Sequence, residues 1–208
     1  MNKAAAIVIA VMVIAALFSS CRRDDSRYED ENNFIAEPIG RREVRIIEYL
    51  DFTGRFSLNI PPRIGNRTVT EIGEKAFADF WFFELAVPNT VVRINDWAFS
   101  GNYIQRLRLS RNLTEIGNGA FMDNRLLNVV IPDSVRRIGY RAFFWNPLES
   151  ITIGANVEFG ELSGENEYEG AWRFTPFEGT GFEEFYIEHG RRAGTYTFNN
   201  GYWSVVFR

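Results

Sequence analysis

Residues that could perform catalysis are scarce in this sequence. His189 is the only histidine and Cys21 the only cysteine among 208 residues, which excludes a zinc site built from Cys and His ligands and a disulfide framework. The G-x-S-x-G nucleophile elbow, the phosphate-binding loop and the H-E-x-x-H motif are also absent. The acidic side chains of residues 161–169 lack the spacing of a Ca²⁺ loop, so we interpret them as a solvated loop. We therefore expect no enzymatic activity, no cofactor and no metal, and we interpret His189 as a surface or cap residue.

Cys21 has another chemistry available, because it follows an apolar N-terminal segment. Lys3 supplies one positive charge, and residues 4–18 carry no polar side chain. A membrane-spanning helix needs about 20 apolar residues, whereas a charged start and a shorter apolar run are typical of a secretory signal peptide. The segment Leu17-Phe18-Ser19-Ser20-Cys21 resembles the lipobox of bacterial lipoproteins. This resemblance implies that residues 1–20 are removed and that Cys21 carries several acyl chains.

An acylated Cys21 would anchor the protein to a membrane, since two or more acyl chains suffice for stable anchoring. We therefore expect a membrane-anchored lipoprotein of the bacterial outer membrane or cell surface. The alternative is an ordinary signal peptide followed by an unpaired thiol. Residues 21–33 are mostly polar and charged, and we interpret them as a flexible tether.

Composition limits the classes of protein that remain. Lys and Arg total 23 and Asp and Glu total 27, which gives a formal net charge of −4. This balance argues against a nucleic-acid partner, because nucleic-acid-binding proteins present a basic face. Apolar residues make up 46% of the sequence, which is enough to build a core and argues against disorder of the whole chain.

A 22-residue period organises the chain from residue 69 onward. Four independent sets of apolar residues keep this step, which is typical of leucine-rich repeats. They are Ile72, Ile94, Ile116 and Ile138; Phe77, Phe99, Phe121 and Phe143; Leu85, Leu107, Val129 and Ile151; and Val87, Leu109, Ile131 and Ile153. Segments such as Leu107-Arg108-Leu109 alternate, so each repeat is expected to contribute one short strand. Because each repeat can bury its apolar face only against its neighbours, the repeats must stack.

Two further sets predict how the turns are built. A glycine follows the isoleucine in three repeats, and its replacement by Asn95 in another indicates a backbone position with positive φ. An asparagine recurs later in the turn, where it is expected to bond backbone amides that face inward. These sets are Gly73, Gly117 and Gly139, and Asn102, Asn124 and Asn146.

The repeats predict a β-rich leucine-rich-repeat solenoid of about six stacked parallel strands, with short turns or helical turns between them and a β-hairpin cap at each end. The sixth strand is expected at residues 184–186, because residues 177–187 match residues 99–109 position by position once an insertion over 158–175 is allowed. We expect an N-terminal cap over 34–68, the repeats over 69–187 and a C-terminal cap over 188–208.

Each cap is expected to be a hairpin, since an open end of a solenoid exposes a sheet edge. The N-terminal hairpin is predicted from residues 44–50 and 55–60, joined around Thr53-Gly54. The C-terminal hairpin is predicted from residues 195–198 and 202–207, because the connecting Asn200-Gly201 is a strong turn signal.

The repeat segments Val69–Phe77, Leu113–Phe121 and Val129–Phe143 resemble the BspA-like leucine-rich repeat, whose pattern is roughly L-x-x-V-x-I-P-x-S-V-x-x-I-G-x-x-A-F. The resemblance covers about residues 58–187, and the segment Ala193–Trp203 is similar to the tails of spirochaetal members. It implies a secreted or surface-attached protein, and such proteins often serve as adhesins for host matrix proteins or other cells.

Two surfaces are candidates for ligand binding. On the strands, the side chains between the inward-facing positions point outward and form an extended face, although Arg106 beside Glu84 could be no more than a solvated ion pair. The candidate residues of this face are Glu84, Arg106, Arg108, Asn128, Val130, Thr152 and Tyr186.

The second candidate surface is aromatic. Its side chains stand where other repeats carry small or polar residues, so they are expected to be exposed. The alternative is that they pack on neighbouring turns. Tyr103 also stands in such a position, and the candidates for the patch are Trp97, Tyr140, Phe144 and Trp145.

The expected function is reversible binding of a host matrix or cell-surface protein by a lipid-anchored solenoid. One alternative is a glycan-binding module that uses Trp97, Phe144 and Trp145. Another is a structural envelope lipoprotein without a specific ligand. The sequence makes no prediction of the oligomeric state.

Overall fold

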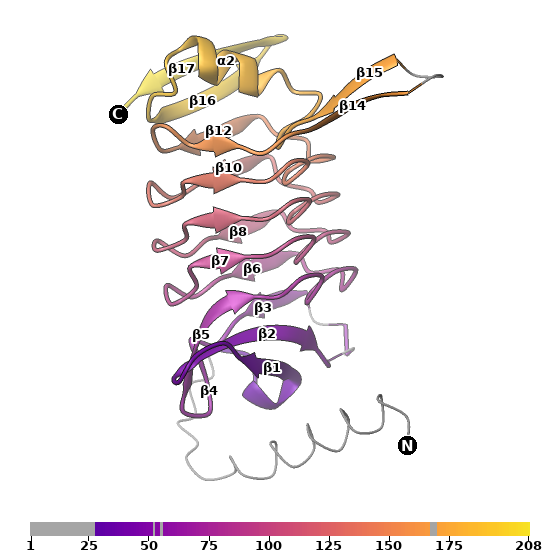
Figure 1. The fold of residues 1–208 in the computed structure, drawn as a ribbon, viewed down its shortest axis with the longest axis vertical. Coiled ribbons are helices and arrows are strands. Elements are labelled where there is room, and N and C mark those ends of the chain that lie inside the picture. Colours follow the sequence, from indigo (N-terminus) through magenta and orange to yellow (C-terminus); the bar gives the residue numbers. More distant parts are fainter. Residues whose placement is uncertain (1–27, 52, 55, 167–169) are drawn as a thin grey trace.

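The computed structural model describes residues 28–51, 53–54, 56–166 and 170–208. The predicted signal peptide, Cys21 and residues 21–27 of the predicted tether lie outside the described residues. The described chain winds as a stack of similar turns along one axis, with a cap at each end (Figure 1). No helix in the described ranges is long and apolar enough to cross a bilayer.

Each turn of the solenoid contributes short strands to two different sides of the molecule. The first side carries one sheet, whose strands follow in the order β1 (Phe34–Pro38), β2 (Glu43–Tyr49), β5 (Arg67–Ile72), β7 (Arg93–Ile94), β9 (Glu115–Ile116), β11 (Arg137–Ile138) and β13 (Glu158–Phe159), with β4 (Arg63–Ile64) beside β5. The sequence predicted one strand per repeat. The additional strands β7, β9 and β11 each have two residues, too few for a recognisable alternation.

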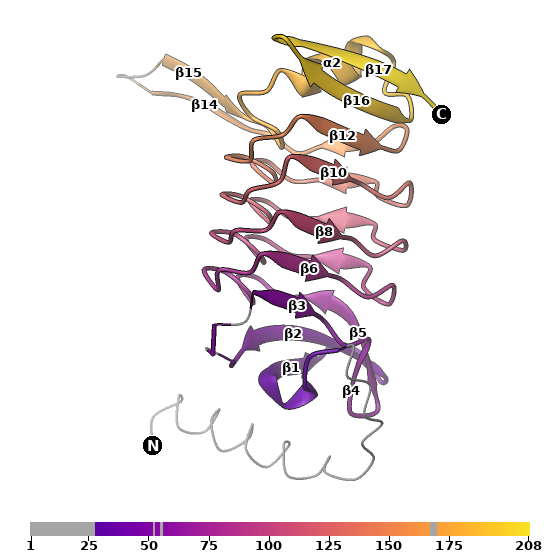
Figure 2. The ribbon, with the colours of Figure 1, turned by 180° about the vertical axis from the view of Figure 1, so that it is seen from behind.

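The second side carries the strands that the sequence predicted. They are β3 (Ser57–Asn59), β6 (Glu84–Ala86), β8 (Arg106–Arg108), β10 (Asn128–Val130) and β12 (Ser150–Ile153). These five strands lie one above another along the axis (Figure 2), and their outward surface is called the strand face below. Two sheets make up this side, β3-β6-β8 and one that begins with β10-β12.

The register of the stacked strands confirms the 22-residue repeat. Leu85 lies opposite Leu107 in the parallel pair of β6 and β8, and Val129 lies opposite Ile151 in that of β10 and β12. On the other side, Ile116 lies opposite Ile138. Equivalent side chains of successive repeats are therefore nearest neighbours, and their contact buries the apolar positions in one continuous core.

The phenylalanine column forms the centre of this core. The rings of Phe99 and Phe121 lie 5.4 Å apart between centroids, as do those of Phe121 and Phe143, with interplanar angles of 9° and 11°. Phe77 and Phe177 extend the stack at its two ends with spacings of 5.1 Å. The spacing of the rings is close to the distance of about 4.8 Å between neighbouring strands, so one large ring per turn fills the interior without a gap.

The asparagine column satisfies backbone groups inside the core, as predicted. Asn124 is fully buried, and its Nδ2 donates to the carbonyl oxygens of Phe99 at 3.0 Å and Phe121 at 3.1 Å. Its Oδ1 accepts a hydrogen bond from the amide of Ile104 at 3.0 Å. One side chain therefore connects two successive turns. Asn102 and Asn146 make the equivalent bonds in their own turns.

The prediction of positive φ at the glycine column was wrong. Gly73, Gly117 and Gly139 have ordinary φ angles, and the reason for glycine is close packing between turns. A Cβ at Gly117 would lie 2.6 Å from backbone atoms of Asn95 and Asp96 in the preceding turn. Positive φ angles recur at the 22-residue step in two other columns, which contain Lys75, Trp97, Gly119 and Arg141, and Asp79, Gly101, Asp123 and Trp145.

The N-terminal hairpin is formed by other segments than predicted. β1 and β2 pair antiparallel, from Phe34 opposite Tyr49 to Pro38 opposite Val44. β2 also pairs in parallel with β5, while residues 57–59 form β3, the first strand of the strand face. β2 and β3 do not pair with each other, because each finds a parallel partner in the next repeat.

The predicted tether is shorter than residues 21–33, because its last part belongs to the cap. Residues Glu31–Asn33 form the 3-10 helix η1, capped by Asp30. The amide of Glu29 donates to the carbonyl oxygen of Asn59 at 2.9 Å, and Glu31 Oε2 accepts from the amide of Gly65 at 2.6 Å. Residues 28–33 are thus held against the first turn.

The sixth strand was predicted wrongly, because residues 182–188 form the helix α2 (Phe182–Glu188). Phe182 and Tyr186 are buried, and their spacing of four residues places both on one face of a helix. Gly181, with a φ of 68°, precedes the helix. The solenoid therefore has about five turns, and α2 covers its end.

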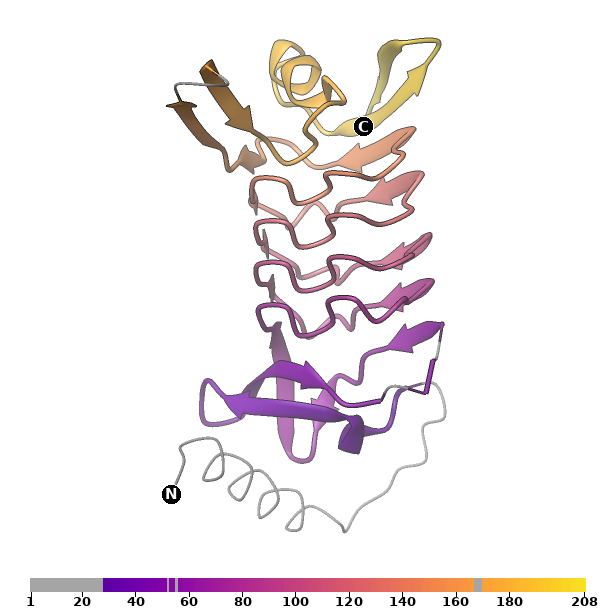
Figure 3. The ribbon, with the colours of Figure 1, turned by 90° about the vertical axis from the view of Figure 1, so that its right-hand side faces the viewer.

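The predicted C-terminal hairpin is confirmed. β16 (Gly194–Asn199) and β17 (Tyr202–Phe207) pair antiparallel, and β16 also pairs antiparallel with β12. Part of the predicted insertion forms a second hairpin, β14 (Leu162–Asn166) and β15 (Gly170–Phe174). This hairpin projects sideways from the stack, on a different side from β17 (Figure 3).

Candidate ligand-binding groove

The predicted strand-face residues lie where the sequence placed them, with one exception. Arg106, Arg108, Asn128 and Val130 are exposed, and Glu84 is half-buried. Thr152 is also half-buried, because its Oγ1 lies 3.0 Å from Oγ1 of Thr195 in the adjacent β16.

Tyr186 is the exception, since it does not belong to the strand face. It lies on α2, is fully buried, and its hydroxyl donates to the carbonyl oxygen of Gly154 at 2.7 Å. Burial raises the pKa of the Tyr186 hydroxyl above its ordinary value. The residue therefore closes the core, and the prediction that it lies on the exposed strand face was wrong.

The charged residues of the strand face differ in what they contact. Arg106 forms an ion pair with Glu84 of the neighbouring strand, and its guanidinium lies 5.9 Å from the centre of the Phe83 ring. Arg108 has no ion pair among the described residues. Arg108 therefore offers a positive charge to a ligand.

The four predicted aromatic candidates do not form one patch. Trp97, Tyr140 and Phe144 are half-buried, whereas Trp145 is 62% exposed. Trp97 lies under the ammonium of Lys75 at 5.5 Å, and Phe144 stacks on Trp145 at 4.9 Å. Within the described ranges, no ring contact joins Trp97 to either of the latter two. The contacts of Trp97 and Phe144 favour the packing interpretation for these two rings, whereas Trp145 is exposed.

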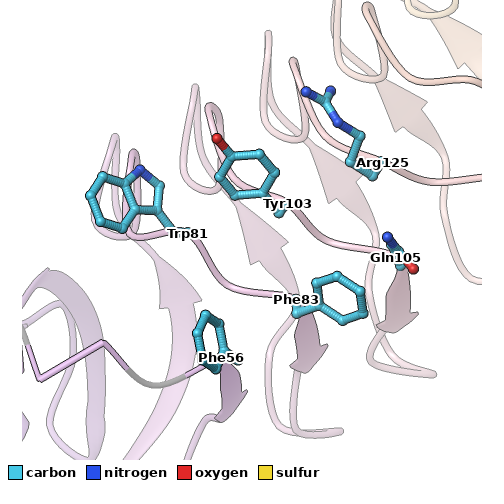
Figure 4. A pocket seen from close by; sticks show the side chains of 6 residues that line it. All are labelled: Phe56, Trp81, Phe83, Tyr103, Gln105 and Arg125. Carbon is cyan, nitrogen blue, oxygen red and sulfur yellow. The ribbon is translucent and has the colours of Figure 1, made fainter.

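A different aromatic surface stands out beside the strand face. Six side chains line a groove of about 440 Å³, which is called the aromatic groove below. Figure 4 shows them as two rows that run along the axis, one just before the strands and one at the preceding turn. The first row is Phe56, Phe83 and Gln105, and the second is Trp81, Tyr103 and Arg125.

The groove brings three exposed aromatic rings together in one place. Phe56 is 71% exposed, Trp81 65% and Tyr103 46%. Among the described residues, no other aromatic ring stacks on Phe56 or Trp81. Large apolar side chains gathered in one exposed place usually mark an interaction site.

The backbone under the aromatic groove is held by the asparagine column. Asn102 Oδ1 accepts from the amide of Phe82, which lies between Trp81 and Phe83, at 3.0 Å. In the next turn Asn124 binds the amide of Ile104, between Tyr103 and Gln105. Further bonds cross the turns, from the amide of Tyr103 to the carbonyl oxygen of Phe82 at 3.0 Å. The groove therefore has a floor that buried polar groups keep in one shape.

Two arginine side chains border the aromatic groove, and each lies beside a carboxylate. The Arg125 guanidinium lies 5.5 Å from the Tyr103 ring centre and 3.6 Å from an oxygen of Asp123. Arg106 lies near Phe83, on the strand side. Arginines next to exposed aromatic rings can bind a carboxylate through two parallel hydrogen bonds. This arrangement suits a ligand with apolar side chains and negative charge.

Of the residues that line this groove, the sequence predicted only Tyr103 as an exposed aromatic side chain, and the two rows were not recognised as one surface. Trp81, Tyr103 and Arg125 are 22 residues apart, as are Phe83 and Gln105. The rows could have been found by listing large side chains in the positions that flank each strand. In the described part of the chain, no three His, Cys, Asp or Glu side chains come together as metal ligands.

Comparison with known structures supports the fold. A leucine-rich repeat protein from Bacteroides capillosus is 27% identical with a TM-score of 0.51, and the match covers 59% of this chain and 95% of that one. The T. pallidum leucine-rich repeat protein TpLRR is 24% identical with a TM-score of 0.50, over 60% of this chain and 70% of that one. No curated protein matches the chain.

The family model described as the BspA type leucine rich repeat region matches residues 57–163 in six copies. The matched residues include all the strands of the strand face and every residue of the aromatic groove except Phe56. The chain therefore belongs to the BspA-type leucine-rich repeat family.

Proposed function

We propose that this protein is a surface-displayed binding module that holds an extended segment of another protein in the aromatic groove. The observation that carries the proposal is the exposure of Phe56, Trp81 and Tyr103 in one groove with a rigid floor. Tryptophan, tyrosine and arginine are the residues that contribute most to protein–protein binding energy. All three types line this groove.

The side chains of the aromatic groove indicate which residues the bound segment of the ligand should contain. Apolar side chains of the ligand would lie between the two rows of rings, and its carboxylates would face Arg125 in the groove and Arg108 on the neighbouring strand face. Because hydrogen bonds to Asn102 and Asn124 already order the groove backbone, binding would cost little conformational entropy on this side. The exposed residues Asn128 and Val130 continue the contact surface along the strand face.

Display at the cell surface rests on the N-terminal sequence. In this proposal Cys21 carries the lipid anchor, and the cap that begins at residue 28 connects the anchor to the solenoid. The anchor would hold the protein in a bacterial membrane, and binding would be reversible. The protein acts as a scaffold and performs no reaction.

Glycan binding is the second candidate function, because sugar rings can also stack on exposed aromatic side chains. Trp145, which is 62% exposed and stacked on Phe144, favours this candidate. Trp145 is not among the residues that line the aromatic groove, so the two functions can be separated by substitution.

The class of ligand can be decided by presenting both classes to the same protein. A library of linear peptides and a glycan array are probed with the wild-type protein, with the double variant Trp81→Ala and Tyr103→Ala, and with Trp145→Ala. We expect peptides rich in apolar and acidic residues to bind the wild-type protein and Trp145→Ala but not the double variant. Glycan binding that depends on Trp145 would replace the proposal with the second candidate. The absence of any binding would favour a structural envelope protein.

A further inference from the structure

The C-terminal end of the solenoid leaves one long strand edge without a partner. β17 pairs with β16 along its whole length, and in the described part of the chain it pairs with no other strand. This edge lies at the end of the stack, opposite the N-terminal cap (Figures 1 and 3).

The hairpin register determines which backbone groups point outward. The turn is Asn200-Gly201, with φ angles of 53° and 86°, so Asn199 and Tyr202 close it as a hydrogen-bonded pair. Hydrogen-bonded and non-hydrogen-bonded pairs then alternate along the strands. The bond from the Arg208 amide to the carbonyl oxygen of Ala193, at 3.1 Å, follows this alternation. Consequently the N–H and C=O groups of Trp203, Val205 and Phe207 face away from β16.

Nothing on β17 prevents it from pairing. Its six residues, Tyr-Trp-Ser-Val-Val-Phe, include no charge and no proline. Edge strands are normally protected by charged residues, by proline or by short length. The edge strand β1 carries Glu37 and Pro38, and the edge strand β13 has only two residues. β17 alone among these three edges lacks such protection.

One face of β17 packs on the protein, and the other is exposed. On one face Trp203 packs against Phe182 of α2 at 5.2 Å and donates from Nε1 to the carbonyl oxygen of Thr180 at 2.9 Å, which fixes the strand in place. On the other face Tyr202 is 79% exposed and Val206 75% exposed. The strand is therefore rigid and presents apolar side chains next to its open edge.

We infer that β17 pairs antiparallel with β17 of a second copy of this chain, which joins two solenoids end to end. A two-fold axis at Val205 places Trp203 opposite Phe207 and Ser204 opposite Val206 of the second copy. The outward N–H and C=O groups then bond to one another, and no like charges are opposed along the strand. The sheet β10-β12-β16-β17 would continue into its equivalent in the second copy.

The composition of β17 favours a second copy of this chain, and not a different protein, as the pairing partner. An uncharged strand has no charge pattern that would select a different protein, whereas a two-fold interface requires only that one surface be complementary to itself. The dimer would present two aromatic grooves, and two linked sites bind a multivalent surface more tightly than one. The pairing does not depend on what those grooves bind.

Sedimentation velocity of the full chain in detergent solution, over a series of protein concentrations, tests this inference. We expect a dimer whose fraction rises with concentration for the wild-type chain, and its loss in Val206→Lys. Val130→Lys is the matched control, because Val130 is 63% exposed on the strand face, away from β17. It should dimerise like the wild-type chain. A wild-type chain that stays monomeric, or a Val206→Lys variant that dimerises equally well, would overturn the inference.

Hydrogen exchange locates the contact independently of the substitution. As the concentration of the wild-type chain rises, the amides of Trp203, Val205 and Phe207 should become protected, while those of β1 should not change. Dimerisation without protection at these three amides would place the interface elsewhere and refute pairing through β17. Circular dichroism melting of Val206→Lys confirms that the variant is folded.

Discussion

At the scale of single residues, the buried asparagines connect the core to the aromatic groove. Asn124 lies between two turns of the core, yet the amide that it binds belongs to Ile104, whose neighbours Tyr103 and Gln105 line the groove. A polar side chain in this position is stabilising only because all its hydrogen-bonding groups find partners. Its role is therefore to hold the turns in the shape that the groove requires.

Replacement of Asn124 by alanine should destabilise the protein by about 3 kcal/mol. The change leaves the buried amide of Ile104 and the carbonyl oxygens of Phe99 and Phe121 without this partner, and each buried group that loses its hydrogen bond costs roughly 1–3 kcal/mol. Urea unfolding measures the loss. Asn128→Ala, on the exposed strand face, is the control and should change stability by less than about 0.5 kcal/mol. Equal effects of the two substitutions would contradict this role of the column.

Glu183 gives the C-terminal cap a dependence on pH. Its side chain is buried, and Oε1 accepts from the amide of Phe177 at 2.5 Å. Desolvation by burial raises the pKa of this carboxyl above the ordinary value of 4.5, although hydrogen bonds from Thr175 and from backbone amides act in the opposite direction. The folded protein therefore binds this proton more tightly than the unfolded chain does.

A raised pKa in the folded state stabilises the protein below the ordinary pKa of the group, and this contribution is lost as the pH rises through the raised value. Glu183→Gln should remove the dependence, because glutamine keeps an oxygen acceptor for Phe177 and cannot ionise. We expect the free energy of unfolding of the variant, relative to wild type, to increase as the pH is raised from 4 upward. Urea unfolding at several pH values measures this, with the exposed Glu188→Gln as control. A difference that stays constant, or that grows toward acid pH, would refute this assignment.

The sequence predicted most contacts of single residues. Because equivalent positions recur every 22 residues, the residue types found at each position indicate whether it is buried or makes hydrogen bonds. The burial of the Phe121 column and the bonds of the Asn124 column both follow from the 22-residue step. The role of Gly117 was misjudged, since a positive φ and a close approach of backbones both select glycine, and only the structure distinguishes them.

At the scale of elements, the short distance between successive turns restricts some positions to glycine. Gly117 lies where two turns approach so closely that a Cβ would meet backbone atoms at 2.6 Å. Backbone atoms cannot move aside as a flexible side chain can. The strand pairs on either side fix this distance.

Substitution Gly117→Ala should therefore destabilise the stack by roughly 1–3 kcal/mol, the usual cost of excess volume in a packed core. Thermal unfolding measures the change. The control is Gly40→Ala, because a Cβ at Gly40 would meet nothing closer than a Glu43 side-chain atom at 3.4 Å. If both variants melted together with the wild-type protein, the turns would not be packed as closely as described.

Element type was predicted well inside the stack and poorly at its ends. A strand inside the repeats has a neighbour on both sides, so its local pattern and its tertiary pairing agree. Residues 177–187 carry the same pattern as residues 99–109 but form α2, because the chain there covers the end of the core with Phe182 and Tyr186. The N-terminal hairpin was misplaced for a similar reason: β2 and β3 pair with β5 and β6.

At the scale of the whole molecule, the solenoid is a rigid support for one exposed surface. The stacked core orders the strand face over five turns, and the aromatic groove lies along its edge over the first three. The sequence predicted that a strand face would exist but not where its binding energy would concentrate. The location of the binding energy depends on which aromatic rings stay exposed in the folded chain. Trp81 and Phe56 could be identified as exposed only in the structure.

The central claim is that the aromatic groove is the binding site, and calorimetric titration of one library-selected peptide tests it most directly. Trp81 and Trp145 are exposed to nearly the same extent, at 65% and 62%, so alanine at each removes an equal ring from two different places. We predict that Trp81→Ala weakens peptide binding by at least about tenfold, as expected for a residue that contributes about 1.4 kcal/mol or more, while Trp145→Ala leaves the affinity unchanged. Equal affinities of wild type and Trp81→Ala, or a greater loss in Trp145→Ala, would contradict the claim.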